Sequence, residues 1–127
     1  MELLTSNSML MLCRSMQFLW SKQSCILDNI ANVETPGYKT KYVTFEEALR
    51  GAIRSADGSG SASAMRSAIQ EAPITVHEAQ ESTRMDENGV NITEQSVELA
   101  RNAYQMQYVL DAINTDYATL RTAIRGR

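Results

Sequence analysis

The segment that decides the fold reads Asn29-Ile30-Ala31-Asn32-Val33-Glu34-Thr35-Pro36-Gly37-Tyr38-Lys39. It follows a long amphipathic run and ends it. Pro36 fixes φ at about −65° and disfavours the helical conformation for Thr35. Gly37 supplies the positive φ that the third position of a type II turn requires. A helix that reaches Asn32 or Val33 must therefore give way to an extended segment here.

The residues before this turn have the pattern of one face of a long helix. From about Ser8 to Val33, apolar residues alternate spacings of three and four, with Gln23 as the polar interruption. This alternation is the a/d pattern of a heptad repeat, so residues 1–33 are expected to form an N-terminal core helix. The seam consists of Met9, Leu12, Met16, Leu19, Ile26, Ile30 and Val33. Three residues lie off the seam and are available for a second contact, namely Phe18, Trp20 and Cys25.

The last part of the chain repeats the pattern. Thr93 is suited to cap a helix start and Gly126 to end it, and no Pro or Gly lies between them. A C-terminal core helix is therefore expected over residues 93–127, with its seam formed by Leu99, Ala103, Met106, Leu110, Ile113, Tyr117, Leu120 and Ile124.

The two seams predict a mainly α fold in one domain. Each seam's natural partner is the other, so the two terminal helices are expected to pair as an antiparallel coiled-coil-like core. A single helix pair buries little apolar surface, at about 25 cal/mol per Å², against roughly 1–2 kcal/mol of backbone entropy per residue. The isolated monomer is therefore expected to be marginally stable, with assembly completing the core.

The middle of the chain, residues 34–92, differs from the two ends in composition and lacks a heptad pattern. Residues 40–45 have the composition of a strand. Residues 51–64 are small and polar, which predicts a flexible loop. Strand-like residues followed by a turn signal predict a small β-hairpin over residues 74–92.

Composition excludes several classes of function. The net charge of −3 lacks the basic excess of a nucleic-acid-binding protein. No apolar run approaches the roughly 20 residues of a membrane span, so no membrane insertion is expected. The first residues lack a basic n-region, which argues against a cleavable signal peptide. Cys13 and Cys25 would lie about 18 Å apart on one helix, beyond the reach of a disulfide.

No catalytic, cofactor or metal site is expected, and the chain does not read as an enzyme. Its one histidine, His77, lies in a strand-like stretch without a recognisable nucleophile and acid. The acidic turn at residues 86–89 lacks the ligand spacing of a calcium loop. Asn29 and Asn32 share one helical face, where they either cap the helix end or bond across to a neighbour; both interpretations stay open.

The opening segment resembles the signature of the flagellar rod, hook and hook-associated axial proteins. That signature places an Asn-Ile-Ala-Asn run, two variable positions and Thr-Pro-Gly-Tyr at the end of the N-terminal helix. The matching residues here are Asn29, Ile30, Ala31, Asn32, Thr35, Pro36, Gly37 and Tyr38, followed by Lys39. Residues 86–104 and 120–126 resemble the proximal rod proteins in particular. The short chain is similar to these as well, since distal rod and hook proteins carry additional β domains.

This resemblance implies a structural subunit of the bacterial flagellar basal-body rod, in the periplasm. The rod acts as a drive shaft and as the wall of the export channel, and its subunits leave the cell through the flagellar type III export apparatus. The implied partners are further copies of the chain, other proximal rod proteins of the FlgC and FlgF types, the adaptor FliE and the ring protein FliF. The Thr-Pro-Gly-Tyr break would direct Tyr38 and Lys39 outward, toward neighbouring subunits.

Two alternatives remain open. A FlgC-type proximal rod protein shares the N-terminal signature, although residues 88–104 argue against it. A non-flagellar coiled-coil adaptor or export chaperone belongs to a different class. Such a protein would lack the Thr-Pro-Gly-Tyr break and would fold well alone.

Overall fold

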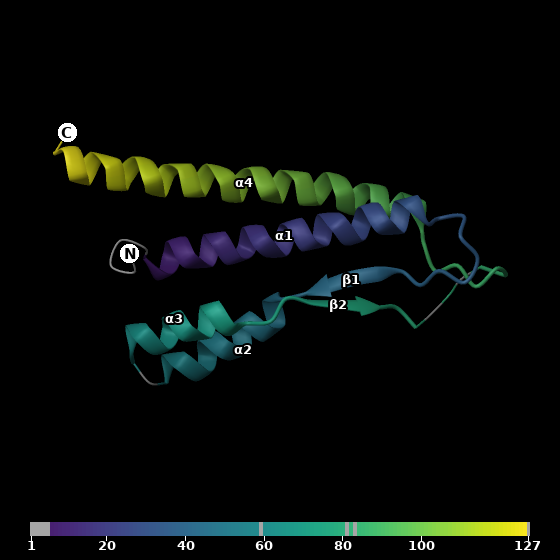
Figure 1. Ribbon diagram of the computed structural model, residues 1–127, viewed down its shortest axis with the longest axis horizontal. Helices are drawn as coiled ribbons and strands as arrows, with labels where there is room; N and C mark the ends of the chain where they lie inside the picture. The colour runs from purple at the N-terminus through teal and green to yellow at the C-terminus, as the bar shows by residue number, and fades with distance from the viewer. Residues whose placement is uncertain (1–5, 59, 81, 83, 127) are drawn as a thin grey trace.

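The computed structural model describes residues 6–58, 60–80, 82 and 84–126 of the 127-residue chain. In this part of the chain the elements are the helices α1 (Asn7–Ala31), α2 (Glu46–Asp57), α3 (Ala62–Glu71) and α4 (Ile92–Arg125), with the strands β1 (Lys41–Thr44) and β2 (Thr75–Glu78). Figure 1 shows an elongated molecule in which α1 lies between α4 on one side and the strands with α2 and α3 on the other. The prediction of a mainly α fold is confirmed.

Local chemistry sets the ends of the two long helices. The Ser6 hydroxyl accepts a hydrogen bond from the Met9 amide and begins α1. The side chain of Asn91 caps α4, so the predicted cap, Thr93, lies inside that helix. Asn91 takes this role because its backbone is extended and its short side chain reaches the first free amides of α4. Gly126 ends α4 in the left-handed conformation, as expected.

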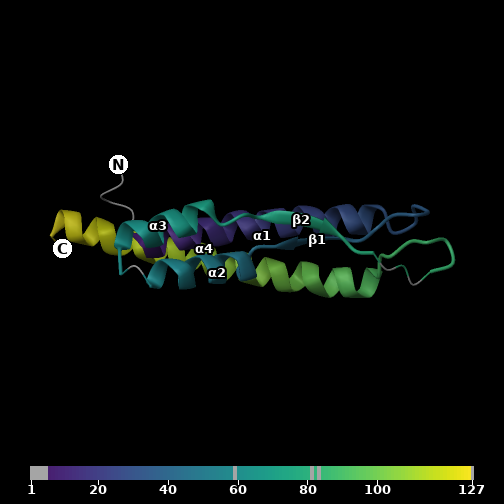
Figure 2. The same ribbon diagram turned by 90° about the horizontal axis from the view of Figure 1, so that it is seen from below.

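Helices α1 and α4 lie side by side and run in opposite directions (Figure 1). The end of α4 extends past the start of α1 in both views (Figures 1 and 2). On α1, the predicted seam residues Leu19 and Ile26 are buried. The other seam positions on α1 are half-buried, namely Met9, Leu12, Met16 and Ile30, and so is Val33, which lies in the turn after α1.

The structure does not confirm the coiled-coil seam predicted for α4. Four of its positions are half-buried, namely Leu99, Met106, Ile113 and Leu120. The alternate positions are exposed, namely Ala103, Leu110, Tyr117 and Ile124. The inward positions lie one residue earlier and are occupied by Asn102, Val109 and Asp116, with Gln95 at the start of the helix. The prediction from apolar periodicity was wrong at these positions because it assigned only apolar residues to the inward face. That face of α4 also carries the amides of Gln95 and Asn102, which hydrogen-bond to α1.

The described residues between 51 and 64 are mostly helical, which corrects the predicted flexible loop; residue 59 of that prediction lies outside the described residues. They contain the end of α2, a short turn and the start of α3, whose first turn is capped by Ser61. Four of the small residues of this stretch are alanines, which favour helix: Ala52, Ala56, Ala62 and Ala64. The two helices are amphipathic and bury Leu49, Ala56 and Ile69.

The α2–α3 hairpin packs on a different face of α1 from the one that contacts α4. Phe45, Leu49, Ile69 and Ala72 form a buried cluster, against which Phe18 of α1 packs. The Phe18 and Phe45 rings stack with their centroids 5.5 Å apart. Of the residues expected to make a second contact, Phe18 packs on this cluster and Cys25 is buried, whereas Trp20 is 61% exposed.

The strands form one antiparallel pair, with Lys41 opposite Glu78 and Thr44 opposite Thr75. The predicted hairpin over residues 74–92 is therefore wrong in its pairing, because β2 pairs with β1 across the α2–α3 hairpin. The helical hairpin brings the two strands together, while residues 84–90 wrap the end of α1 instead. None of the described helices is both long and apolar enough to cross a membrane.

Candidate assembly site at the end of the helix pair

The turn that ends α1 forms as its sequence predicts. Gly37 has a φ of +71°, and the Tyr38 amide donates to the carbonyl oxygen of Thr35 at 3.3 Å. These are the features of a β-turn with glycine at its third position. The Asn32 side chain closes the end of α1 by donating to the Asp28 carbonyl at 2.8 Å and accepting from the Thr35 hydroxyl at 3.2 Å.

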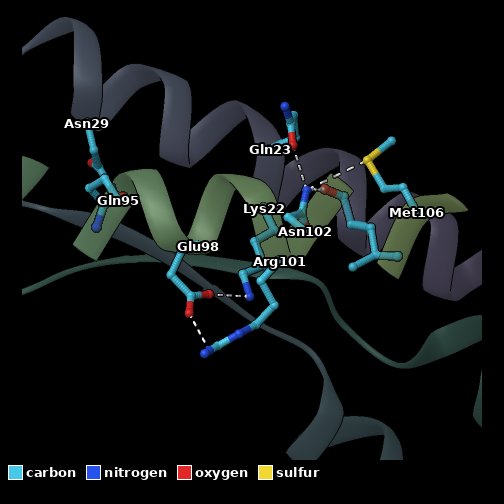
Figure 3. Close-up of polar contacts among 9 residues, drawn as sticks. Lys22, Gln23, Asn29, Gln95, Glu98, Arg101, Asn102 and Met106 are labelled. Atoms are coloured by element: carbon cyan, nitrogen blue, oxygen red, sulfur yellow. Dashed lines mark hydrogen bonds and ion pairs between the residues drawn. The ribbon is translucent and has the colours of Figure 1, made fainter. Parts of the chain in front are cut away.

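Asn29 connects three segments of the chain from a fully buried position. Its Nδ2 donates to the Lys41 carbonyl at 2.8 Å and to Oε1 of Gln95 at 2.9 Å, and Figure 3 shows Gln95 beside it. Its Oδ1 accepts from the Lys41 amide at 2.8 Å and from the Tyr38 hydroxyl at 3.4 Å. An asparagine has two donor hydrogens and two acceptor lone pairs, so this side chain is fully used. Asn29 thus joins α1 to the start of β1 and to α4.

Asn88 fastens the segment before α4 onto the turn that ends α1. The side chain is fully buried, and its Nδ2 donates to the carbonyls of Asn32 at 2.9 Å and Thr35 at 2.7 Å. Its Oδ1 accepts from the Val90 amide at 2.8 Å. The amide of this one residue therefore holds both turns in a fixed relation.

Backbone hydrogen bonds complete the contact between the two turns. The Gly37 amide donates to the Asp86 carbonyl at 2.9 Å, and the Gly89 amide donates to the Tyr38 carbonyl at 3.0 Å. Arg84 adds a hydrogen bond to the Val33 carbonyl and an ion pair with Asp86. The two turns, residues 32–38 and 84–90, are interlocked at the end of the helix pair; together with Asn29 we call them the turn clamp.

A third buried amide lies nearer the middle of the helix pair. Asn102 of α4 is fully buried, and its Nδ2 donates to the Leu19 carbonyl at 3.1 Å and to Oε1 of Gln23 at 2.7 Å (Figure 3). Its Oδ1 is buried and has no hydrogen-bond partner within the described part of the chain. Gln23, the polar interruption in the predicted seam, is thus the acceptor that fixes Asn102.

An ion pair flanks this amide contact. Lys22 Nζ lies 2.8 Å from one carboxylate oxygen of Glu98, and Arg101 Nη1 lies 2.5 Å from the other (Figure 3). The hydrogen bond from Lys22 holds the pKa of Glu98 below its usual value, against the opposing effect of burial.

In the turn clamp, burial raises the pKa of Tyr38, and the nearby Lys41 ammonium opposes that rise.

The two interpretations left open for the asparagines of the motif both hold, one for each residue. Asn32 caps the end of α1, whereas Asn29 bonds across to β1 and α4. Tyr38 is half-buried and turns back to Asn29, so the expectation that it points outward is wrong. The other motif residues lie in α1 or in the turn that follows it, and Lys39 is half-buried beside them.

Sequence reasoning missed Asn88, Gln95 and Asn102. For Gln95 and Asn102, which both lie in α4, a signal was present, because an asparagine or glutamine at a regular heptad position is a known device for fixing helix register. If every second seam position of α4 had been placed one residue earlier, for example at Asn102 in place of Ala103, then Asn102 and Gln95, seven residues before it, would both have been predicted to face α1.

The chemistry of the turn clamp is that of neutral amides and exchanged backbone hydrogen bonds. Among the described residues, no three His, Cys, Asp or Glu side chains are placed to hold a metal ion. His77 lies on the exposed face of the strand pair, where it stacks on Tyr42 and bonds to the Thr44 hydroxyl. What the arrangement does chemically is hold the N-terminal helix, the strand pair and the C-terminal helix in fixed register.

Comparison with known proteins adds one relative. No protein-family model matches the chain. The chain is similar to the flagellar basal body rod protein FlgB of Bacillus subtilis (strain 168), with 29% identity over 115 residues that cover 83% of each chain. This similarity supports the flagellar rod protein family and a place in the flagellar basal body, in agreement with the resemblance of the turn motif.

Proposed function

We propose that this chain is a structural subunit of the proximal rod of the bacterial flagellum, of the FlgB type, and has no catalytic role. The observation that carries the proposal is the similarity to a FlgB protein over most of the length of both chains. The resemblance of residues 86–104 to the FlgB-type proximal rod proteins in particular supports the FlgB type over the FlgC type.

The geometry suits a subunit that transmits torque. A shaft must not deform between neighbouring subunits, and the turn clamp fixes the two long helices to each other at one end of the molecule. Large apolar side chains remain exposed on those helices, including Trp20, Tyr104 and Tyr117. Exposed apolar side chains that cluster on a surface are typical of sites for other proteins. Assembly would bury them.

The expected partners are neighbours in such a shaft. The chain associates with its own copies, with proximal rod proteins of the FlgC and FlgF types, with the adaptor FliE and with the ring protein FliF. It reaches the periplasm through the flagellar type III export apparatus, and there it forms part of the export channel wall.

Deletion and complementation in the source bacterium would test this proposal. Loss of the gene should abolish motility and leave basal bodies without a rod, and an epitope-tagged copy should restore both and co-purify with basal bodies. A Pro36→Ala/Gly37→Ala variant should be exported but fail to assemble, whereas Gly51→Ala, in the exposed middle of α2, should behave as wild type. Full motility without the gene, or a tagged chain absent from purified basal bodies, would contradict the proposal.

A further inference from the structure

An apolar groove lies open between α1, α2 and α4. Its volume is about 770 Å³, within the range of sites that bury a sizeable ligand or side-chain cluster. Phe18 and Phe45 form part of its floor, and Tyr104 and Tyr108 line it from α4. These two tyrosines are 75% and 76% exposed, although each carries a large apolar ring. We call this feature the α2–α4 groove.

The rim of the α2–α4 groove is basic. Arg50, Arg54 and Arg101 line it, against a single acidic residue, Glu46. Arg101 is paired with Glu98, whereas Arg50 and Arg54 form no ion pair within the described residues. A helix with acidic residues beside an apolar stripe would match this groove in both polarity and charge.

The opposite face of α1 carries an exposed stripe of mixed polarity, with Trp20 and Leu27 as its large apolar side chains. Its members alternate spacings of four and three and are all exposed, namely Cys13, Gln17, Trp20, Ser24 and Leu27; we call this stripe the Trp20 ridge. Trp20 is 61% and Leu27 49% exposed. Two exposed acidic residues lie near its C-terminal end, namely Asp28, whose carboxylate is 3.7 Å from Lys41 Nζ, and Glu34 in the turn that follows α1. At about 100° per residue, the ridge lies roughly opposite the α1 side chains that line the groove.

We propose that the Trp20 ridge of one copy of this chain seats in the α2–α4 groove of the next copy, with the Trp20 ring between Tyr104 and Tyr108. Trp20 and Leu27 are about 10.5 Å apart along α1, and the groove-lining part of α2, residues 46–54, extends about 12 Å. The dimensions therefore match. Trp, Tyr and Arg are also the residues that most often dominate binding energy at protein interfaces.

This contact makes an open assembly rather than a closed dimer. The ridge and the groove are different surfaces on opposite sides of one helix, so each copy can bind one neighbour through each of them. Such head-to-tail contacts continue as a helical filament unless the rotation closes a ring. The inference deepens the proposed function and rests on it in one respect, namely that copies of this chain meet in the rod.

Two complementary variants of the full chain would test the contact. Trp20→Ala removes the ridge anchor, and Tyr104→Ala/Tyr108→Ala removes the groove wall; all three side chains are exposed, so both variants should fold. Tyr117→Ala is the matched control, because it removes an exposed tyrosine of α4 outside the groove. Sedimentation velocity gives the oligomeric state. The single tryptophan of the chain reports burial of the ridge through its emission wavelength and acrylamide quenching.

The expected result is specific to a head-to-tail contact. Wild-type chain and Tyr117→Ala associate with concentration, and the Trp20 emission shifts to shorter wavelength as they do. Each of the two interface variants alone requires a concentration at least roughly tenfold higher. Their equimolar mixture forms dimers and stops there, since one intact ridge meets one intact groove. In that mixture, the tryptophan of the Tyr104→Ala/Tyr108→Ala chain becomes protected from acrylamide.

Three results would overturn the proposal. The first is a mixture that stays monomeric while wild-type chain associates, and the second is association with no change in Trp20 emission. The third is a wild-type chain that stays monomeric and protects Trp20 only when a different rod protein is added. All three leave the rod assignment standing, because that assignment is tested separately by the presence of the chain in basal bodies.

Discussion

Replacing Asn29 by alanine tests the central claim about the turn clamp. The substitution removes three hydrogen bonds of 2.8–2.9 Å, two to the backbone of Lys41 and one to Gln95. Each such bond contributes about 1 kcal/mol net, and a buried partner left unsatisfied costs about 1–3 kcal/mol. Asn29→Ala should therefore lower the free energy of unfolding by about 3 kcal/mol. That is a large share of the roughly 5–15 kcal/mol typical of a small domain.

Asn29→Asp separates hydrogen bonding from packing, because its shape is nearly unchanged. One carboxylate oxygen can still accept from the Lys41 amide. The other would face the Lys41 carbonyl and the Gln95 Oε1, both of which are acceptors. This environment raises the folded-state pKa of the new carboxyl above its unfolded value. The penalty is therefore absent at low pH, where the carboxyl is protonated, and appears as the pH rises through the unfolded pKa.

Urea unfolding followed by far-ultraviolet circular dichroism, at a concentration where the chain is monomeric, gives the required free energies. Asn114→Ala is the matched control, since Asn114 is an exposed asparagine of α4 and its loss should change stability by no more than about 0.5 kcal/mol. If Asn29→Ala costs less than about 1 kcal/mol, or if Asn29→Asp shows no pH dependence relative to wild type, the clamp is not held by this side chain.

Three further predictions concern backbone strain, charge and register. Gly37→Ala should lower the free energy of unfolding in urea by about 1 kcal/mol, because φ is +71° there although the added Cβ meets no atom within 4 Å. Gly51→Ala is equally unobstructed but lies inside α2, so it should raise the free energy of unfolding by about 0.5–1 kcal/mol. If both variants changed the free energy of unfolding in the same direction, the strain argument would be contradicted. Glu98→Gln should be less stable than wild type at pH 7, and the difference should vanish as the pH falls through the depressed pKa of Glu98, as thermal unfolding across pH can check. The double variant Gln23→Leu/Asn102→Leu should raise the melting temperature, because apolar groups replace two amides that are only partly satisfied by hydrogen bonds. It should also broaden the amide NMR signals, because α1 and α4 can then align in more than one way. A lower melting temperature with sharp signals would refute this account.

What could be predicted from the sequence follows from chemistry close in the chain. Pro36 and Gly37 set the turn after α1, Gly126 ends α4, and apolar periodicity identifies both long helices. These features act over a few residues, so a single sequence contains them. The mainly α fold follows from them directly.

What could not be predicted depends on partners distant in the chain. Asn88 lies more than 50 residues from the carbonyls that it binds, and Asn102 lies about 80 residues from its partners on α1. Strand β1 pairs with β2 only because α2 and α3 fold between them. The same hairpin explains the error over residues 51–64, where a serine- and glycine-containing stretch resembled a linker although its alanines favour helix.

The three buried asparagines also determine how the helix pair responds to force. Their contacts lie at successive points along the molecule, at Asn88, at Asn29 with Gln95, and at Asn102 with Gln23. Apolar side chains can slide past one another by a fraction of an ångström with little change in energy, whereas hydrogen bonds weaken steeply with misalignment. A pull on α4 along its axis would shift α4 by about 1.5 Å per residue of slip and strain all three contacts together. The pair is therefore expected to resist shear as a single stiff strut that yields abruptly, rather than creeping one contact at a time.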